Sequence, residues 1–157
     1  MENEAGQEIA DALGVLLRRT TRTQLYKQLT EGMDEAVDEL TYPVLSALAR
    51  TGSRSAAELA PDVDVDRSGV TRRASRLADA GLVRREADPT DRRAHLLVLT
   101  DQGRSAVAEL RARLAAHLMT GMSSWPPGEV GQFAHLLRRF TVEGPFVQQR
   151  QDRPGAS

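Results

Sequence analysis

Residues 66–82 read DRSGVTRRASRLADAGL, and they contain the signals that begin and end one helix. Asp66 is a residue type that caps helix N-termini. The valine before it and the valine four residues after it have the spacing of a hydrophobic staple. Gly81 suits the left-handed position that follows a helix, and the leucine after it is placed to contact Leu77, as in a Schellman motif. The sequence therefore predicts a helix over residues 67–80.

The two sides of this helix differ in chemistry when it is drawn as a wheel with about 100° per residue. One side is apolar and carries Val70, Ala74, Leu77 and Ala78. The opposite side carries Ser68, Arg72, Ser75 and Arg76, with Thr71 and Arg73 at the flanks. Small hydroxyl residues allow a helix to approach a DNA groove closely, and arginine bonds guanine or phosphate. An ordinary surface helix is the alternative, but such helices usually mix acidic and basic residues in pairs.

A β-hairpin is predicted directly after this helix. Its strands are expected at 82–87 and 94–100, and the residues between them, Asp88-Pro89-Thr90-Asp91, form turns. The hairpin carries Arg84, Arg85, Arg92 and Arg93. Arginines at a hairpin tip are suited to a minor groove, where negative potential is focused. Asp91 is placed either to brace a neighbouring arginine or to form a surface ion pair of little energetic value.

Three helices are predicted on the N-terminal side. Apolar residues at three- and four-residue steps favour a helix over 7–29. Thr41 is expected to cap a second helix that ends before Gly52. Ser55 and Glu58 have the spacing of a capping box, which opens a short third helix.

Two more helices are predicted after the hairpin. Thr100 is expected to cap the fifth, and the sixth has an apolar stripe from Val130 to Phe140. The tail from about residue 144 is polar and is expected to be frayed.

The charge of the chain is near neutral overall but unevenly distributed. Its 157 residues carry a net charge of −1, and 40% of them are hydrophobic, which is enough for one packed domain with appended helices. Residues 67–93 hold eight arginines and four acidic residues, a net charge of +4, whereas residues 31–39 form an acidic cluster. This asymmetry is typical of a DNA binder, with a solvated arginine-rich face as the alternative.

Several other classes of protein are not expected. The absence of cysteine excludes disulfides and thiolate zinc sites, and His95, His117 and His135 show no metal-ligand spacing, so no metal or cofactor is expected. No nucleophile elbow, Walker motif or dinucleotide motif occurs, which argues against an enzyme. No stretch approaches the roughly 20 apolar residues of a membrane helix. The first residues do not resemble a signal peptide. A cytoplasmic protein without membrane contact is therefore expected.

Several short motifs follow one another in a fixed order. They are LTYPVL at 40–45, AELA at 57–60, SGVTR at 68–72, RL at 76–77, AGLVR at 80–84, DPTDRR at 88–93 and LTDQG at 99–103. In this order and spacing they resemble the multiple antibiotic resistance regulator (MarR) family of bacterial winged helix-turn-helix transcription factors. The most specific piece is the Asp-Arg-Arg of the wing followed by Leu-Thr and Gly, and the likeness covers roughly residues 40–143.

The resemblance implies a mainly α fold with a small β-hairpin wing, flanked by N- and C-terminal dimerisation helices. It implies a homodimer that binds a pseudo-palindromic operator in double-stranded DNA, often as a repressor, and that releases DNA when a small, often aromatic, effector binds between the dimerisation and DNA-binding regions. The expected divisions are 1–39 for the N-terminal helix and acidic linker, 40–103 for the winged helix-turn-helix, 104–143 for the C-terminal helices and 144–157 for the tail.

The resemblance also implies roles for individual residues. Ser68, Thr71 and Arg72 would lie in the major groove, and Arg92 would reach the minor groove. Arg76 has two interpretations, because the wheel points it outward whereas the matching position in the family can form an intramolecular ion pair. The full set of expected DNA contacts is Arg67, Ser68, Thr71, Arg72, Arg73, Ser75, Arg76, Arg84, Arg92 and Arg93.

The residues favour a dimer independently of the resemblance. The first and sixth helices carry apolar stripes although they flank a compact core, and such stripes need cover. A two-fold dimer supplies it and spaces two helices for half-sites about one turn of DNA apart; the alternative is that both stripes fold back on their own domain. A winged-helix interaction module without DNA binding is the second functional hypothesis. It would be expected to carry acidic or bulky apolar residues on the outward face of 67–80.

Overall fold

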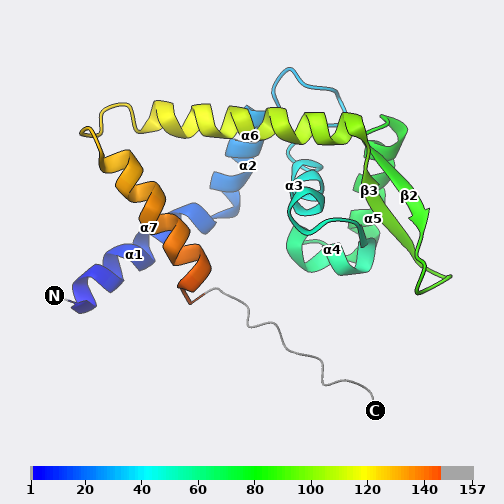
Figure 1. Ribbon diagram of the computed structural model, residues 1–157, viewed down its shortest axis with the longest axis horizontal. Helices are drawn as coiled ribbons and strands as arrows, with labels where there is room; N and C mark the ends of the chain where they lie inside the picture. Colours follow the sequence, from blue (N-terminus) through cyan, green and yellow to red (C-terminus); the bar gives the residue numbers. More distant parts are fainter. Residues whose placement is uncertain (1, 146–157) are drawn as a thin grey trace, which may run out of the picture. The chain divides into compact units, whose positions relative to one another are not determined.

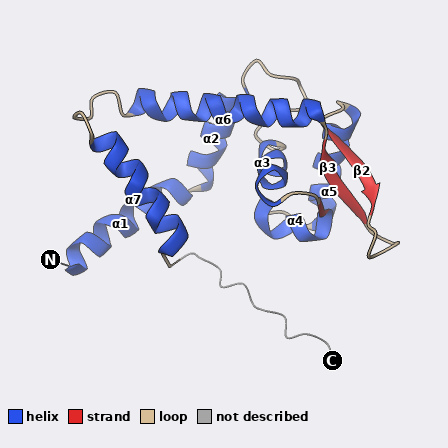
Figure 2. Cartoon of the chain, viewed as in Figure 1, coloured by secondary structure: helices blue, strands red, loops and turns tan. Residues whose placement is uncertain are grey.

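The computed structural model describes residues 2–145, and helices dominate this range (Figures 1 and 2). The elements in order are α1 Glu2–Leu17, α2 Arg19–Thr30, α3 Tyr42–Thr51, β1 Arg54–Ser55, α4 Ala56–Val63, α5 Arg67–Asp79, β2 Val83–Ala87, β3 His95–Leu99, α6 Asp101–Gly121 and α7 Glu129–Glu143. The chain divides into two compact units, one ending at Ala115 and the other beginning at Ala116. The expected fold class, mainly α with a small hairpin, is confirmed. The tail expected from residue 144 lies outside the described residues from position 146 onward.

The three strands form one antiparallel sheet in the order β1-β3-β2. Val83 pairs with Leu99 and Ala87 with His95, which makes β2 and β3 the predicted hairpin. The two-residue strand β1 was not predicted, and Arg54 on it pairs with Leu97 at the other edge of β3. Helices α3, α4 and α5 precede the hairpin and complete a winged helix-turn-helix (Figure 1).

One apolar core joins these elements. Its buried members are Leu29, Val37, Val44, Leu45, Ala47, Leu48, Leu59, Val63, Val70, Ala74, Leu77, Leu82, Val83, Leu97, Val107 and Leu110. Every helix of the winged domain contributes, and so does the first half of α6. Burial of this surface from several directions fixes the orientation of α5, because a packed core tolerates little displacement.

The predicted single helix over 7–29 is wrong in one respect, because Arg18 is extended (φ −58°, ψ 133°) and separates α1 from α2. The break falls beside a run of threonines, which lose side-chain freedom in a helix and compete for its backbone hydrogen bonds. Leu16 and Leu17 are 61% and 62% exposed, so packing within the described residues does not hold this turn straight.

The start of α3 is built differently from the prediction. Thr41 has helical backbone angles and its side chain does not cap the helix. Asp38 caps the turn that leads into α3, since its Oδ1 accepts hydrogen bonds from the amides of Leu40 and Thr41, both at 2.9 Å. The Thr41 hydroxyl oxygen in turn accepts from the Asp38 amide at 3.0 Å. This reciprocal pair resembles a capping box, and its first residue lies three residues before the expected cap, Thr41.

The other predicted caps of the winged domain are confirmed. Ser55 and Glu58 form a full capping box at the start of α4. The Thr100 hydroxyl accepts from the amide of Gly103 at 3.1 Å and donates to the carbonyl of Gly81 at 2.6 Å. Thr100 therefore ties the start of α6 to the loop that follows α5.

No helix within residues 2–145 has the length and apolar character needed to cross a membrane.

Candidate nucleic-acid interface

Helix α5 has the ends that the sequence predicts. Asp66 accepts a hydrogen bond from the amide of Gly69 at 2.8 Å, which caps the N-terminus. At the C-terminus the amide of Gly81 bonds the carbonyl of Ala78, and the amide of Leu82 bonds the carbonyl of Leu77 at 2.9 Å. These two bonds with a left-handed Gly81 (φ +74°) form a Schellman motif. The helix is therefore held at both ends by its own sequence.

The apolar and polar sides of α5 are separated as the wheel predicts. Val70, Ala74 and Leu77 are fully buried. Ser68, Thr71 and Arg72 are exposed together on the side away from the core. The side chains of Arg67 and Arg72 make no hydrogen bond or ion pair with any of residues 2–145. The outward face near the start of α5 thus offers two unpaired guanidinium groups beside two small hydroxyl residues.

The close approach of α5 to the preceding loop requires a glycine at position 69. Gly69 is buried, and a Cβ atom there would lie 3.0 Å from the Asp66 carboxylate and 3.1 Å from the Val65 side chain. This packing brings the first two turns of α5, which carry Ser68 and Arg72, to a defined position on the domain.

The wing tip is organised by its two aspartates. Asp88 Oδ1 accepts hydrogen bonds from the Thr90 amide at 2.8 Å and the Thr90 hydroxyl at 2.7 Å, which hold the pKa of the Asp88 carboxyl below its ordinary value. Asp91 accepts from the backbone amide of Arg93 at 3.0 Å. Asp91 therefore braces the turn backbone, and neither of the two roles considered for it is the one the structure shows.

The wing arginines differ in their partners. Arg84 forms an ion pair with Glu86 at 2.7 Å. Arg92 and Arg93 at the tip are exposed, and within the described part of the chain their guanidinium groups have no partner. The tip thus presents two unpaired positive charges to solvent.

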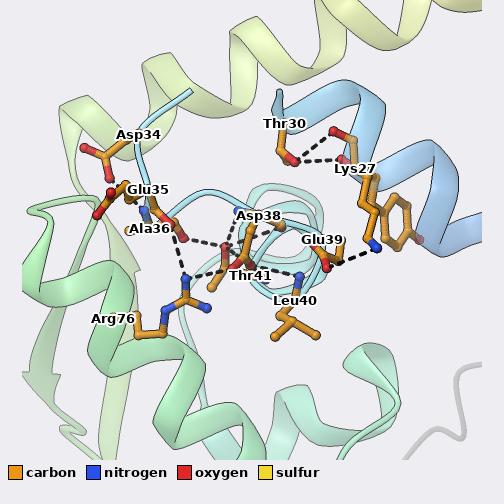
Figure 3. A network of polar contacts seen from close by, with 11 residues as sticks. Lys27, Thr30, Asp34, Glu35, Ala36, Asp38, Glu39, Leu40, Thr41 and Arg76 are labelled. Carbon is orange, nitrogen blue, oxygen red and sulfur yellow. Dashed lines mark hydrogen bonds and ion pairs between the residues drawn. The ribbon is translucent and has the colours of Figure 1, made fainter. Parts of the chain in front are cut away.

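Arg76 forms the intramolecular ion pair that was one of its two interpretations. Its Nη2 lies 2.7 Å from Asp38 Oδ2 and donates to the carbonyl of Glu35 at 3.2 Å. Figure 3 shows the guanidinium pointing from α5 into the segment between α2 and α3, where Asp38 also holds Thr41. Arg76 therefore joins the acidic linker to the predicted DNA-reading helix.

The charge state of Asp38 follows from these contacts. Burial raises its pKa, but the hydrogen bonds from Arg76, Thr41 and Leu40 outweigh that effect and hold the pKa of the carboxyl below its ordinary value of 3.8. Because the folded pKa is below the unfolded one, the contribution of Asp38 to stability is complete at pH values well above its ordinary, unfolded pKa. It is lost as the pH falls through the lower, folded pKa.

Replacing Asp38 with asparagine is expected to lower the free energy of unfolding at pH 7 by about 1 kcal/mol, since a partly exposed charge-assisted bond is lost while the cap is kept. Urea denaturation at pH 7 and pH 3 measures the effect. The difference between wild type and variant should shrink at pH 3. Asp79→Asn is the control, because Asp79 is exposed and has no contact of this kind within residues 2–145. An equal loss at both pH values would contradict the assignment.

Two other predicted residues are not simply outward. Ser75 is half-buried and its hydroxyl accepts a hydrogen bond from Arg85 Nη2 at 2.7 Å. Arg73 is half-buried and lines a cavity beside α2. Arg85, which bonds Ser75, was not among the expected DNA contacts. The signal was available, because side chains alternate along a strand and Arg85 shares the face of buried Val83.

The geometry defines a class of protein. A helix-turn-helix with a basic wing, whose second helix shows unpaired arginine and hydroxyl groups to solvent, is a winged-helix DNA-binding domain. No group of His, Asp or Glu suited to hold a metal ion occurs among residues 2–145.

Comparison with known proteins gives the family. The MarR family model matches residues 37–94. The HTH-type transcriptional repressor MdtR of Bacillus subtilis is 31% identical over 133 residues, which span 84% of this chain and 86% of that protein. The chain belongs to the MarR family, whose members are DNA-binding transcriptional regulators and not enzymes.

Two solved structures extend the comparison. The PcaV regulator of Streptomyces coelicolor, described in complex with its natural ligand, is 30% identical, with 76% of this chain and 85% of that chain covered and a TM-score of 0.54. A MarR regulator of Methanosarcina mazei is 20% identical, with 88% and 96% covered and a TM-score of 0.66, which shows the shared fold.

Proposed function

We propose that the chain is a homodimeric repressor whose protomers each place α5 in the major groove of one half of a pseudo-palindromic operator. The observation that carries this proposal is the free guanidinium of Arg72 on the same exposed face as Ser68 and Thr71. A groove-facing arginine bonds guanine in a bidentate manner, and small neighbours allow its backbone to come close enough. The proposed contacts are Arg67, Ser68, Thr71 and Arg72 in the major groove, Arg92 and Arg93 at the minor groove, and Arg73 and Arg84 at their edges.

A dimer is supported by apolar side chains that the single chain leaves uncovered. In the first unit they include Ile9, Leu16 and Leu17 of α1, which are at least half exposed. In the second unit they include Phe133, Leu136 and Leu137 of α7, which are 43% to 49% exposed. Exposed apolar side chains at helical spacing on each of these helices are suited to an interface, and a two-fold axis would match the symmetry of a palindromic operator.

A footprint tests the proposal. The wild-type protein should protect two half-sites about one helical turn apart in DNA upstream of a regulated gene. Sedimentation should show a dimer at the same protein concentration. Protection of a single half-site by a monomer would contradict the proposal. The absence of any protection would also contradict it and would favour a winged-helix interaction module.

Replacing Arg92 with alanine is expected to weaken DNA binding by about the same factor for operator and unrelated duplexes. It should also reduce the slope of log K against log salt concentration by about 1. The reason is that an exposed wing arginine neutralises phosphate charge in the groove. Fluorescence anisotropy at several salt concentrations measures the slope. An unchanged slope would show that the wing tip does not approach DNA.

An effector site is proposed in the cavity between α2 and α5. It has a volume of about 240 Å³, and Tyr26 lines it together with three arginines, Arg19, Arg22 and Arg73, and three acidic residues, Glu39, Asp62 and Asp64. Arg22 Nε is buried and has no hydrogen-bond partner among the described residues, and its Nη2 is 3.8 Å from Asp64. The three carboxylates balance the three arginines, so the unpartnered Arg22 Nε beside the Tyr26 ring is the donor that suits the carboxylate of an aromatic ligand. Because Arg73 belongs to α5, an anion here would contact the DNA-reading helix itself. The ligand of the relative PcaV supports the presence of an effector.

Calorimetry with benzoate tests this site, with the uncharged benzamide as the ligand control. Benzoate should bind and weaken operator binding, whereas benzamide should do neither. Arg22→Ala should abolish the response to benzoate and leave operator affinity intact. Equal binding of both compounds would contradict the proposed role of the arginines.

A further inference from the structure

A cavity of about 710 Å³ lies between α5 and the wing. Helix α5 contributes Arg67, Thr71 and Ser75, which are four residues apart and therefore form one stripe along the helix. The wing contributes Arg85, Arg93 and His95. Asp91 is the acidic residue of the lining, and its carboxylate already accepts from a backbone amide. Three guanidinium groups against one carboxylate make the cavity positive.

The hydroxyl groups of the stripe face the cavity as acceptors. Thr71 donates its hydroxyl hydrogen to the carbonyl of Arg67 at 2.9 Å, and Ser75 donates to the carbonyl of Thr71 at 2.9 Å. A hydroxyl that has used its hydrogen offers only lone pairs. Ser75 uses one of them to accept from Arg85. Ser75 is thus bonded on both sides before any DNA arrives.

Arg85 is anchored at one nitrogen only. It follows buried Val83 on the same face of β2 and pairs across the sheet with buried Leu97. Its Nη2 is bonded to Ser75, whereas its Nε and Nη1 make no hydrogen bond within residues 2–145. An arginine held in place with two free donor nitrogens is suited to bind a phosphate oxygen.

We propose that this cavity holds a backbone phosphate of the operator, with Arg85 as the phosphate ligand and Ser75 as the residue that positions it. The inference rests on the proposed DNA-binding function and adds a contact between the two groove-facing elements. It also changes the role of Ser75, which acts through Arg85 and not on a base. Because the bond joins α5 to the wing, one phosphate contact would fix the spacing of both elements on the duplex.

The test compares operator affinities by anisotropy for wild type, Arg85→Ala, Ser75→Ala, the double variant and Arg85→Lys. Arg85→Ala should bind about tenfold more weakly and lose about 1 from the salt slope. Ser75→Ala should bind about threefold more weakly with the slope kept, and should cause no further loss in the Arg85→Ala background. Arg85→Lys should restore the slope without restoring the affinity, because lysine keeps the charge but not the fork. Arg50→Ala is the charge-matched control, since Arg50 is exposed at the end of α3 and lines neither of the two cavities described.

A duplex series with single neutral methylphosphonates gives the second arm. At one position in the duplex, the methylphosphonate should lower the affinity of the wild-type protein and leave the affinity of Arg85→Ala unchanged. The inference would be overturned if the wild type binds operator and a normally folded Arg85→Ala variant binds it equally tightly. That result would leave the proposed function standing. Additive losses for Ser75→Ala and Arg85→Ala with an altered base preference would show that Ser75 contacts a base. Failure of the wild type itself to bind operator would overturn both.

Discussion

Replacing Arg72 with alanine is expected to weaken operator binding by about 1–3 kcal/mol, the cost of losing one good base contact. The side chain is exposed on the outward face of α5 and has no partner among residues 2–145, so its removal leaves no buried group unsatisfied. The folded state should therefore be unaffected. The loss should also be larger for the operator than for an unrelated duplex, because the contact is to a base.

Anisotropy with both duplexes measures this difference. The matched control is Arg50→Ala, which removes the same charge from the same domain without touching α5. A loss that is equal on the operator and the unrelated duplex would show that Arg72 contacts phosphate only. A full-affinity variant would show that the outward face of α5 does not read DNA.

Replacing Gly103 with alanine is expected to lower the free energy of unfolding by about 3 kcal/mol or more. A Cβ at this buried position would overlap the carbonyl oxygen of Leu82 and would lie 3.1 Å from Leu99 Cδ2. The obstructing atom is backbone, which cannot turn away as a side chain would. The same carbonyl accepts the amide of Thr100 at 3.1 Å, so the junction of the sheet with α6 would be forced apart.

Urea denaturation followed by circular dichroism tests this cost. Gly14→Ala is the control, because Gly14 is a helical residue with no atom within 4 Å of its missing Cβ. It should leave stability unchanged or raise it by up to about 1 kcal/mol through helix propensity. A Gly103→Ala protein as stable as wild type would contradict the close approach of α6 to the wing.

The parts of the fold that the sequence predicts are those with local causes. Both ends of α5 follow from signals a few residues apart, Asp66 at one end and Gly81 with Leu82 at the other. The capping box at Ser55 and the cap at Thr100 are of the same kind. The hairpin follows from its composition and its turn. Apolar spacing placed Val70 and Leu77 in the core because a helix has only one side to bury.

The features of the fold and the site that the sequence does not predict depend on contacts between distant segments. Strand β1 is too short to have a sequence signal and exists because β3 offers it an edge. The ion pair of Arg76 joins residues 38 positions apart, and a wheel has no information about the linker that covers one side of it. Arg73 is turned toward a cavity for the same reason. Arg85 is the exception, since the alternation of β2 from Val83 predicts its direction.

Sequence-selective contact between α5 and DNA is tested most directly by one titration. Wild-type protein is added to a labelled duplex from its own upstream region and to a scrambled duplex, each at several salt concentrations. Tighter binding to the upstream duplex, with log K falling linearly in log salt for both, is the predicted result. Equal affinity for the two duplexes, or affinity independent of salt, would contradict the account.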